Sequence, residues 1–180
     1  YIDDVYFCMG APEEDEGNVV GRVNAKGDLI IATCDNLSEP GAGGMRMVND
    51  PANIKEGSGA WWVKDNNLIV MNVKYPEPFN VAKYTNGYLH MWIWVESLAN
   101  LKGYQFELTS SGGYDVNEKN WSDFLKKDGW NEIYLPLKEG GETGGAFDPA
   151  GLNYIRFYCF ANEGSNIFYI DDIYFTNTKK

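Results

Sequence analysis

The residues whose types and spacing could bind a ligand lie within residues 87–109, in two aromatic runs joined by a short polar turn. In the first run the only histidine of the chain, His90, and the two tryptophans Trp92 and Trp94 alternate with aliphatic residues. Because a β-strand sends successive side chains to opposite faces, these three residues share one face. The two indole rings are about 7 Å apart along such a strand, which is close to the spacing of adjacent sugars in a polysaccharide.

In the second run, Gln105 and Glu107 alternate with apolar residues in the same way. If the apolar faces of the two runs share a core, Gln105 and Glu107 lie beside Trp92 and Trp94 on the opposite face. Flat apolar rings next to amide and carboxylate groups suit a sugar, whose C–H bonds stack on an aromatic plane while its hydroxyl groups form hydrogen bonds. The alternative is a second buried layer, because tryptophan is usually mostly buried.

Further residues are expected on the same face. Residues 152–161 also alternate, and this parity places Arg156 and Tyr158 beside Glu107. A guanidinium group there can bind sugar hydroxyl groups or stack on an aromatic ring; the alternative is a structural ion pair with Glu107. By the same parity, Trp62 faces outward and Trp61 faces the core.

The acidic residues are also candidates for catalysis. Glycoside hydrolysis needs two carboxyl groups, and Glu107, Asp115 and Glu118 are the closest acidic grouping in the sequence. Their alternative role is to hold the neighbouring loop by accepting hydrogen bonds from backbone N–H groups. His90 has no Ser or Cys in a nucleophile motif. A jelly-roll glycoside hydrolase or lyase and a sugar-blind spacer or adhesion domain are therefore rivals to a non-catalytic binding domain.

Composition limits the class of partner. The chain has 180 residues and a formal net charge of −11, and this length allows one domain with a substantial core. A negative field disfavours nucleic acid and polyanionic ligands, and no apolar run reaches about 18 residues, so membrane insertion is not expected. Cys8, Cys34 and Cys159 lack the spacing of a zinc site; a Cys34–Cys159 disulfide is left open.

The two ends of the chain are nearly the same heptapeptide. Residues 1–7 read YIDDVYF and residues 169–175 read YIDDIYF, which indicates an internal repeat. Residues 1–7 are therefore interpreted as the closing strand of a preceding similar module or as an edge strand. Residues 8–27 contain an acidic run, several Gly residues and Pro12, and are interpreted as a linker, with residues 28–180 as the main module.

Short apolar runs separated by turn residues predict about eight strands and less than about a tenth helix. The expected strands are 29–34, 58–64, 68–75, the two runs of 87–109, 130–137, 152–161 and 167–175. Pro76 and Pro78 are expected to interrupt the ladder after residue 75, since proline cannot donate to it, and one helical turn is expected near 121–127. The pattern predicts an all-β antiparallel sandwich or jelly roll.

The order of motifs resembles that of a known family. An apolar strand ending in Asp35 is followed by Glu-Gly before a strand, then by GYLHMWIWV, FELTSSGGYDVNEKNW, GWNEIYLPL, FDPAGLNYIRFY and the closing YIDDIYF. Over roughly residues 28–177 this resembles the β-sandwich carbohydrate-binding modules with a galactose-binding-like jelly roll. Such modules are appended, often in tandem, to secreted or surface-bound polysaccharide-degrading enzymes and glycan-binding proteins of bacteria.

The resemblance implies a function and a location. The expected function is non-catalytic binding of a neutral polysaccharide or oligosaccharide on a concave, aromatic-lined sheet, which holds an attached enzyme or a cell surface close to its glycan. The expected location is extracellular or at the cell surface, with neighbouring modules in the same polypeptide. The expected ligand-binding residues are Trp62, His90, Trp92, Trp94, Gln105, Glu107, Arg156 and Tyr158.

The resemblance also implies a structural Ca²⁺ bound through the closing aspartates. Asp171 and Asp172 would point to opposite faces of a regular strand, so one would face inward, where a carboxylate needs a partner or a cation. Calcium takes about six to eight oxygen ligands, including backbone carbonyl groups. The expected ligands are Asp171 or Asp172 together with Asp35 or Glu56; the alternative is an aspartate that accepts hydrogen bonds from loop N–H groups.

Overall fold

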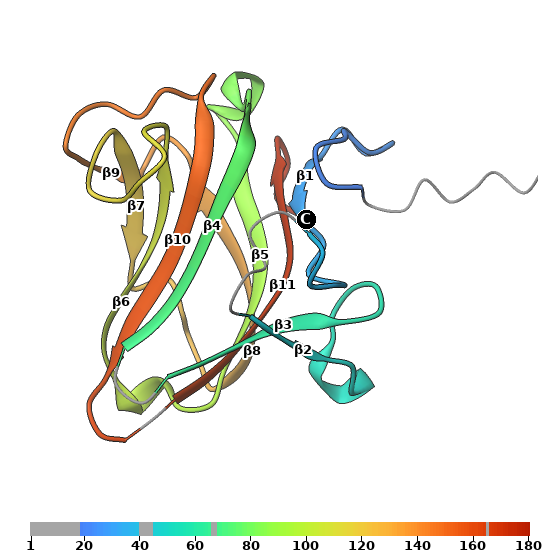
Figure 1. The fold of residues 1–180 in the computed structure, drawn as a ribbon, viewed down its shortest axis with the longest axis vertical. Coiled ribbons are helices and arrows are strands. Elements are labelled where there is room, and N and C mark those ends of the chain that lie inside the picture. The colour runs from blue at the N-terminus through green and yellow to red at the C-terminus, as the bar shows by residue number, and fades with distance from the viewer. Residues whose placement is uncertain (1–18, 40–44, 66–67, 165) are drawn as a thin grey trace, which may run out of the picture.

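Two antiparallel β-sheets packed face to face form the fold (Figure 1). The computed structural model describes residues 19–39, 45–65, 68–164 and 166–180. One sheet, named the β11 sheet, contains β1 (Leu29–Ala32), β2 (Arg46–Val48), β3 (Ala60–Asp65), β5 (Tyr88–Val95), β8 (Gly129–Pro136) and β11 (Asn166–Thr176). The other, named the β10 sheet, contains β4 (Leu68–Phe79), β6 (Leu101–Thr109), β7 (Glu118–Ser122), β9 (Gly141–Thr143) and β10 (Leu152–Ala161).

Hydrogen bonding orders the strands β2-β3-β11-β5-β8 in the first sheet, with β1 also pairing with β11, and β4-β10-β6-β7-β9 in the second. The helices in the described residues are three short 3-10 turns, η1 (Pro51–Asn53), η2 (Ala82–Tyr84) and η3 (Leu98–Asn100). The predicted all-β antiparallel sandwich is confirmed.

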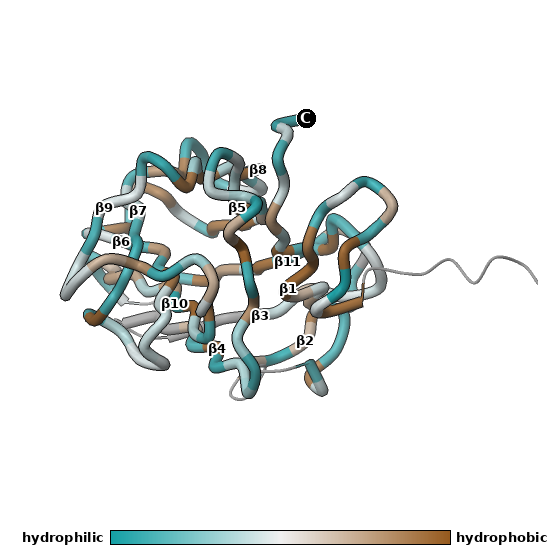
Figure 2. The backbone as a smooth tube through the Cα atoms, turned by 90° about the horizontal axis from the view of Figure 1, so that it is seen from above, coloured by the Kyte–Doolittle hydropathy of each residue, from teal (hydrophilic) through white to brown (hydrophobic). Residues whose placement is uncertain are grey.

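The core lies between the sheets and is filled by the alternate apolar residues of each strand. Met91 and Ile93 of β5, Phe106 of β6 and Phe157 of β10 are all fully buried. Trp61 is also fully buried, as the parity of its strand predicted. Seen from above, hydrophobic and hydrophilic positions follow one another along the strands (Figure 2), as expected when one face of each strand packs inward.

The chain changes sheets between β5 and β6. The two strands are joined through η3, yet β5 lies in the β11 sheet and β6 lies in the β10 sheet. Their apolar faces do share one core, but from opposite sides, so their outer faces point away from each other. The expectation that Trp92 and Trp94 lie beside Gln105 and Glu107 on one face is therefore wrong.

Three local predictions also fail for physical reasons. Strand β4 continues through Pro76 and Pro78 to Phe79, because it is an edge strand whose register with β10 shifts in this region. Residues 123–128 are not helical; β7 ends at Ser122 instead. The strands β2, β7 and β9, of three to five residues, were not predicted, since their sequences are polar or too short to show a period.

The ends of the chain and the cysteines complete the fold. Residues 1–18, with the first heptapeptide, most of the expected linker and Cys8, lie outside the described residues, so their interpretation stays a prediction. Within the described residues, Val23 pairs with Leu29 through an isolated bridge. Cys34 and Cys159 are both buried, and no disulfide joins them. No helix in the described part of the chain is long and apolar enough to cross a membrane.

Candidate functional site

A buried ion pair organises the outer face of the β10 sheet. Arg156 of β10 and Glu107 of β6 are directly opposite each other in the ladder. Arg156 Nε donates to one carboxylate oxygen of Glu107 at 2.6 Å, and Nη2 donates to the other at 2.8 Å. This two-point contact fixes the plane of the guanidinium group. Arg156 thus forms the ion pair with Glu107 that the sequence left open as an alternative. The ion pair also fixes the guanidinium group in a position where it can make a further contact.

The carboxyl group of Glu107 is in an unusual environment. Its side chain is fully buried, and this loss of solvation is the main cause that raises its pKa to about 7. The hydrogen bond from Arg156 lowers the pKa, whereas the neighbouring Glu118 raises it further. Glu107 is therefore a buried anchor for Arg156 and not a group that a ligand meets directly.

Aromatic rings enclose the guanidinium group of Arg156. Its central carbon lies 4.1 Å from the ring centroid of Tyr114 and 4.8 Å from that of Tyr158. The hydroxyl group of Tyr158 donates to Gln105 at 3.1 Å, and Phe160 packs edge-on to Tyr158. Tyr114 and Phe160 are 55% and 44% exposed, so this face offers open aromatic surface beside fixed polar groups.

We name Tyr114, Arg156, Tyr158 and Phe160 the tyrosine–arginine surface. The sequence placed Arg156, Tyr158, Gln105 and Glu107 on one face, and the structure brings these four together. The sequence pattern did not identify Tyr114, which reaches this surface from the loop between β6 and β7. No periodic signal exists for a residue in a loop, so only the folded loop reveals it.

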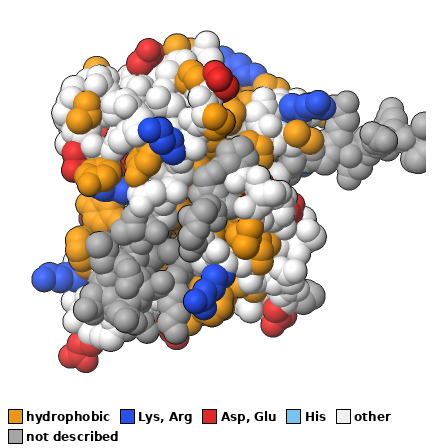
Figure 3. Space-filling model, viewed as in Figure 1, with side chains coloured by type: hydrophobic (Ala, Val, Ile, Leu, Met, Phe, Trp, Pro, Cys, Tyr) orange, Lys and Arg blue, Asp and Glu red, His pale blue; other side chains and the backbone are white. Residues whose placement is uncertain are grey.

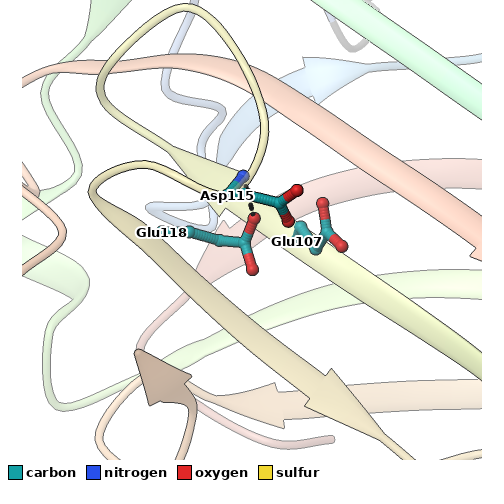
Figure 4. A group of neighbouring side chains, drawn as sticks. All are labelled: Glu107, Asp115 and Glu118. Carbon is teal, nitrogen blue, oxygen red and sulfur yellow. Dashed lines mark hydrogen bonds between the residues drawn. The ribbon is translucent and has the colours of Figure 1, made fainter. Parts of the chain in front are cut away.

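Three acidic side chains gather beside this surface (Figure 4). Glu107, Asp115 and Glu118 place ligand oxygens within 4.8 Å of one another, and they form the group with metal-ligand spacing among the described residues. The backbone N–H of Asp115 donates to Glu118 at 2.9 Å, as the loop-holding alternative predicted. The group could hold a metal ion, and Arg156 already contributes a positive charge to it, 3.7 Å from Asp115.

The outer face of the β11 sheet carries a row of rings across four strands. Trp62 of β3 is opposite Tyr169 of β11, which is opposite Trp94 of β5, which is opposite Trp130 of β8. We name these four residues the aromatic row. All four are half-buried, and the rings of Trp94 and Tyr169 stack at 4.8 Å. Trp92 lies two residues before Trp94 on β5, and its ring centroid is 6.4 Å from that of Trp130.

The sequence found Trp62, Trp92 and Trp94 but could not place Trp130 on a face, and it missed Tyr169. The signal for both is the register of the ladder, which one sequence does not reveal. Two cations cover part of these rings: Arg46 lies over Trp62, and Lys55 lies over Trp92 and Trp130, at 5.1 to 5.6 Å from the ring centroids.

His90 is more enclosed than the sequence suggested. It is 1% exposed, its ring stacks on Tyr174 at 4.2 Å, and Nδ1 lies 3.2 Å from the carbonyl oxygen of Asp172. Nε2 lies 3.4 Å from the carboxylate of Glu132. Burial is the main cause that lowers the pKa of His90. It shares the outer face with Trp92 but lies beneath the surface.

The closing aspartates lie at a β-bulge. The pairing of β11 with β5 shifts register between Asp171 and Tyr174, and Asp172 has a φ of 52°. Asp171 is opposite Trp92 in the ladder, and Asp172 lines a pocket with Trp92. The expectation that one aspartate faces inward is therefore wrong, because the extra residue of the bulge turns both carboxylates to the outer face.

The four expected calcium ligands are partly engaged already. One oxygen of Asp171 accepts from the backbone N–H groups of Lys55 and Glu56 at 2.8 and 3.1 Å. Asp35 likewise accepts from the N–H of Gly59 at 3.0 Å. The second oxygen of Asp171 and one oxygen of Asp172 are buried, with no hydrogen-bond partner among the described residues. Burial raises the pKa of both aspartates to about 7.

Comparison with solved structures identifies the fold class. A family 30 carbohydrate-binding module aligns with a TM-score of 0.56 at 11% sequence identity, covering 83% of this chain and 80% of that one. A family 11 carbohydrate-binding module from Clostridium thermocellum, solved with a β-1,3-1,4-mixed-linked tetrasaccharide, aligns with a TM-score of 0.53 at 14% identity, covering 76% and 83%. The chain has the fold of the β-sandwich carbohydrate-binding modules, as the resemblance predicted.

The same fold also occurs inside larger proteins. An exo-β-agarase aligns with a TM-score of 0.53 at 11% identity over 76% of this chain, which is 23% of that protein. No protein-family model matches the sequence, and no curated protein matches it either.

Proposed function

We propose that this domain binds a neutral polysaccharide without acting on it, and that the tyrosine–arginine surface is its binding face. The observation that carries the proposal is the guanidinium group of Arg156, held by Glu107 on one edge and enclosed by Tyr114 and Tyr158. Exposed rings next to an oriented, planar donor match the alternating C–H and hydroxyl surface of a sugar.

The comparisons support a glycan as the ligand class. Several of the solved structures with this fold are named as carbohydrate-binding modules, and one of them holds a tetrasaccharide. Because Tyr114 and Phe160 are exposed, binding should be shallow and of micromolar affinity or weaker. Each stacked ring should contribute about 0.5–1.5 kcal/mol beyond the area it buries.

The state of the acidic residues favours binding over hydrolysis. Glu107 and Glu118 are 0% and 1% exposed, and both oxygens of Glu107 already accept from Arg156. Glu118 accepts from Asn120 at 2.8 Å and from the N–H of Asp115. A glycosidase needs carboxyl groups that reach the scissile bond and a water molecule. The buried, hydrogen-bonded carboxyl groups of Glu107 and Glu118 reach neither.

Affinity electrophoresis against a panel of soluble neutral polysaccharides tests the proposal. The wild-type domain should be retarded by at least one of them, and Tyr158→Ala and Phe160→Ala should each remove most of the retardation. Tyr88→Ala is the matched control, because Tyr88 is a half-buried tyrosine on the other sheet, where its ring meets Tyr134. Full retardation of both β10 variants would refute this binding face.

The aromatic row is a second candidate surface for the same function. Its four rings span three strand spacings of about 4.8 Å each, which is long enough to contact more than one sugar of a glycan chain. If the ligand binds here, Trp94→Ala and Trp92→Ala, whose ring lies beside the row, should abolish polysaccharide retention, as expected from the sequence. The β10 variants should then still be retained by the polysaccharide. The same gels therefore assign the ligand to one sheet or the other.

On one face of the domain, the described residues form no broad adhesive surface. On the face shown in Figure 3, hydrophobic side chains stand in small groups among polar ones. An adhesion or spacer domain would be expected to show a larger continuous apolar patch.

We also propose a structural Ca²⁺ beside the closing aspartates. The support is the unpartnered buried oxygen of Asp171, which a cation would satisfy. Asp171 would hold the ion together with Asp35 or Glu56, with Asp172 as the neighbouring carboxylate and backbone carbonyl groups as the remaining ligands. Elemental analysis of the purified domain tests this proposal. If the domain, after exchange into calcium-containing buffer, holds far less than one bound calcium ion per protein chain, the proposal is contradicted.

The wider setting of the domain is part of the proposal. A non-catalytic glycan-binding domain acts by holding something else near the polysaccharide. We therefore infer an extracellular or cell-surface polypeptide with neighbouring modules, of which residues 1–7 would be the last strand of one. Limited proteolysis of a longer polypeptide should cut within residues 8–18 and release a domain that still unfolds cooperatively.

A further inference from the structure

A polar pocket opens on the outer face of the β11 sheet, on the other side of the sandwich from the tyrosine–arginine surface. Its volume is about 210 Å³. Since a water molecule in the liquid occupies about 30 Å³, the pocket has room for a single sugar ring but not for a chain. Trp92 and Tyr174 contribute aromatic rings to its lining, and His90, Glu132 and Asp172 contribute polar atoms.

His90 presents an acceptor that has no donor. A carbonyl oxygen only accepts, so the contact of Nδ1 with the carbonyl of Asp172 places the ring proton on Nδ1. In the neutral ring Nε2 is then an acceptor. Nε2 lies 3.4 Å from an oxygen of Glu132. Two acceptors therefore face each other, and Nε2 has no hydrogen-bond partner among the described residues.

Asp172 adds a third acceptor of the same kind. The residue is 6% exposed, and its Oδ1 is buried with no hydrogen-bond partner in the described part of the chain. Buried polar atoms are almost always paired, because an unpaired one loses its hydration without compensation. The chemical group that the pocket lacks is therefore a strong hydrogen-bond donor.

The charge of the pocket selects the kind of donor. Its lining contains four carboxylates but only two lysine ammonium groups, so a cation is favoured. A primary ammonium group has three N–H donors and is attracted to the face of an indole ring.

We propose that this pocket binds the protonated amino group of an amino sugar, with the sugar ring against Trp92 and the ammonium group donating to His90, Glu132 and Asp172. Only the sugar part of this inference rests on the proposed function. The domain then carries two sites on opposite faces: one for a neutral chain and one for a single aminated sugar.

Titration with D-glucosamine, followed by ¹H–¹⁵N NMR of the six tryptophan indole groups, tests the pocket. Near pH 7 the amine is still largely protonated and Asp172, with a pKa of about 7, is still partly ionised. Under these conditions the indole signal of Trp92, assigned through Trp92→Phe, should shift in a saturable way. D-glucose and N-acetyl-D-glucosamine have no ammonium group and should leave the signal in place. An equal response to all three sugars, or no response to glucosamine, overturns the proposal.

Two variants locate the interaction. Glu132→Gln removes a partly exposed charge and should weaken glucosamine binding about tenfold, in the range expected when a hydrogen bond to a charged group is lost. Glu96→Gln, which removes an exposed charge at the end of β5 outside the pocket, should leave it unchanged. Asp172→Asn should also weaken binding, with the indole spectrum reporting whether it folds. An unchanged affinity in Glu132→Gln overturns the assignment.

The two sites fail independently. Tyr158→Ala should remove most of the polysaccharide retention and leave the glucosamine titration intact, because the residue lies on the other sheet. If no polysaccharide is retained but glucosamine still binds, the proposed function fails and the pocket stands. If Ca²⁺ displaces glucosamine from Asp171→Asn, which lacks the proposed calcium ligand, the pocket binds cations in general, and the assignment to an amino sugar is overturned.

Discussion

Removing Arg156 should destabilise the domain in a way that depends on pH. In Arg156→Met the carboxyl group of Glu107 loses both of its guanidinium donors while it stays fully buried. Removing one partner of a buried ion pair typically costs about 3–5 kcal/mol, because the other charge is left uncompensated. That full loss is expected only where Glu107 is charged.

The sign follows from the direction of the pKa shift. The pKa of Glu107 in the folded domain is about 7, above the ordinary value of 4.5. The stability gained by protonating Glu107 in the folded state is therefore present below the ordinary value and is lost as the pH rises toward 7. In Arg156→Met the guanidinium no longer lowers this pKa, so the folded-state value rises further. The variant can thus keep Glu107 neutral in acid, but not in alkali.

Urea unfolding at two pH values measures the effect. We expect a loss of about 1–2 kcal/mol near pH 5, from the missing hydrogen bonds and ring contacts, and of about 3–5 kcal/mol near pH 8.5. Adding Glu107→Gln to Arg156→Met should recover most of the alkaline loss. Lys102→Met, which removes an exposed cation from β6, is the control. An equal loss at both pH values would show that the buried charge of Glu107 is not the cause.

Three further outcomes are expected. Chelation of Ca²⁺ should lower the melting temperature of the wild type, as measured by differential scanning calorimetry. If calcium had been present at one hundred times its Kd, the loss is equivalent to about 2.7 kcal/mol. Chelation should have little effect on Asp171→Asn, and an unchanged melting temperature of the wild type would contradict the calcium site. Gly87→Ala should destabilise by at least about 1–3 kcal/mol in urea unfolding, because a Cβ there would lie 2.2 Å from the backbone oxygen of Thr176, whereas Gly103→Ala meets no atom within 4 Å and should be close to neutral. Tyr84→Phe should cost about 1 kcal/mol in the same assay, since the buried hydroxyl group donates to the carbonyl of Gly27 at 2.8 Å; no measurable change would mean that this hydrogen bond is not formed in solution.

The alternation of side chains along each strand could be predicted from the sequence. Burying Met91 and Ile93 while leaving Trp92 and Trp94 outside is a local property with a period of two. The same holds for Phe157 between Arg156 and Tyr158. The prediction succeeded for each strand taken alone because the period depends on nothing but the chain itself.

Which strands are neighbours could not be predicted in this way. A polar turn after Val95 fits a hairpin within one sheet and a crossing to the opposite sheet equally well, and both bury the same apolar residues. The choice depends on long-range pairing, in which β5 lies between β11 and β8 and β6 lies between β10 and β7. For this reason the sequence merged two surfaces, one with Trp92 and Trp94 and one with Glu107 and Arg156.

The sequence gives at most a weak indication of the β-bulge in β11. Two adjacent aspartates before an apolar pair look like an ordinary strand with alternating faces, and the left-handed φ of Asp172 is a conformation that aspartate tolerates better than most residues. Burial near the backbone N–H groups of Lys55 and Glu56 gives Asp171 its role. Those groups are more than a hundred residues away in the sequence, so no local pattern points to them.

The tyrosine–arginine surface combines a rigid part with a part that depends on a loop. Arg156 and Tyr158 lie on β10, which is paired on both sides, so their positions are fixed by two ladders. Tyr114 comes from a loop whose neighbours Asp115 and Asn117 have positive φ angles. That loop is held from outside by Gly144, where a Cβ would lie 2.1 Å from the backbone oxygen of Asp115. A side chain at Gly144 would therefore displace the loop but leave the strand in place. It follows that the fit to a ligand can change through Tyr114 without any change in the sheet that carries Arg156.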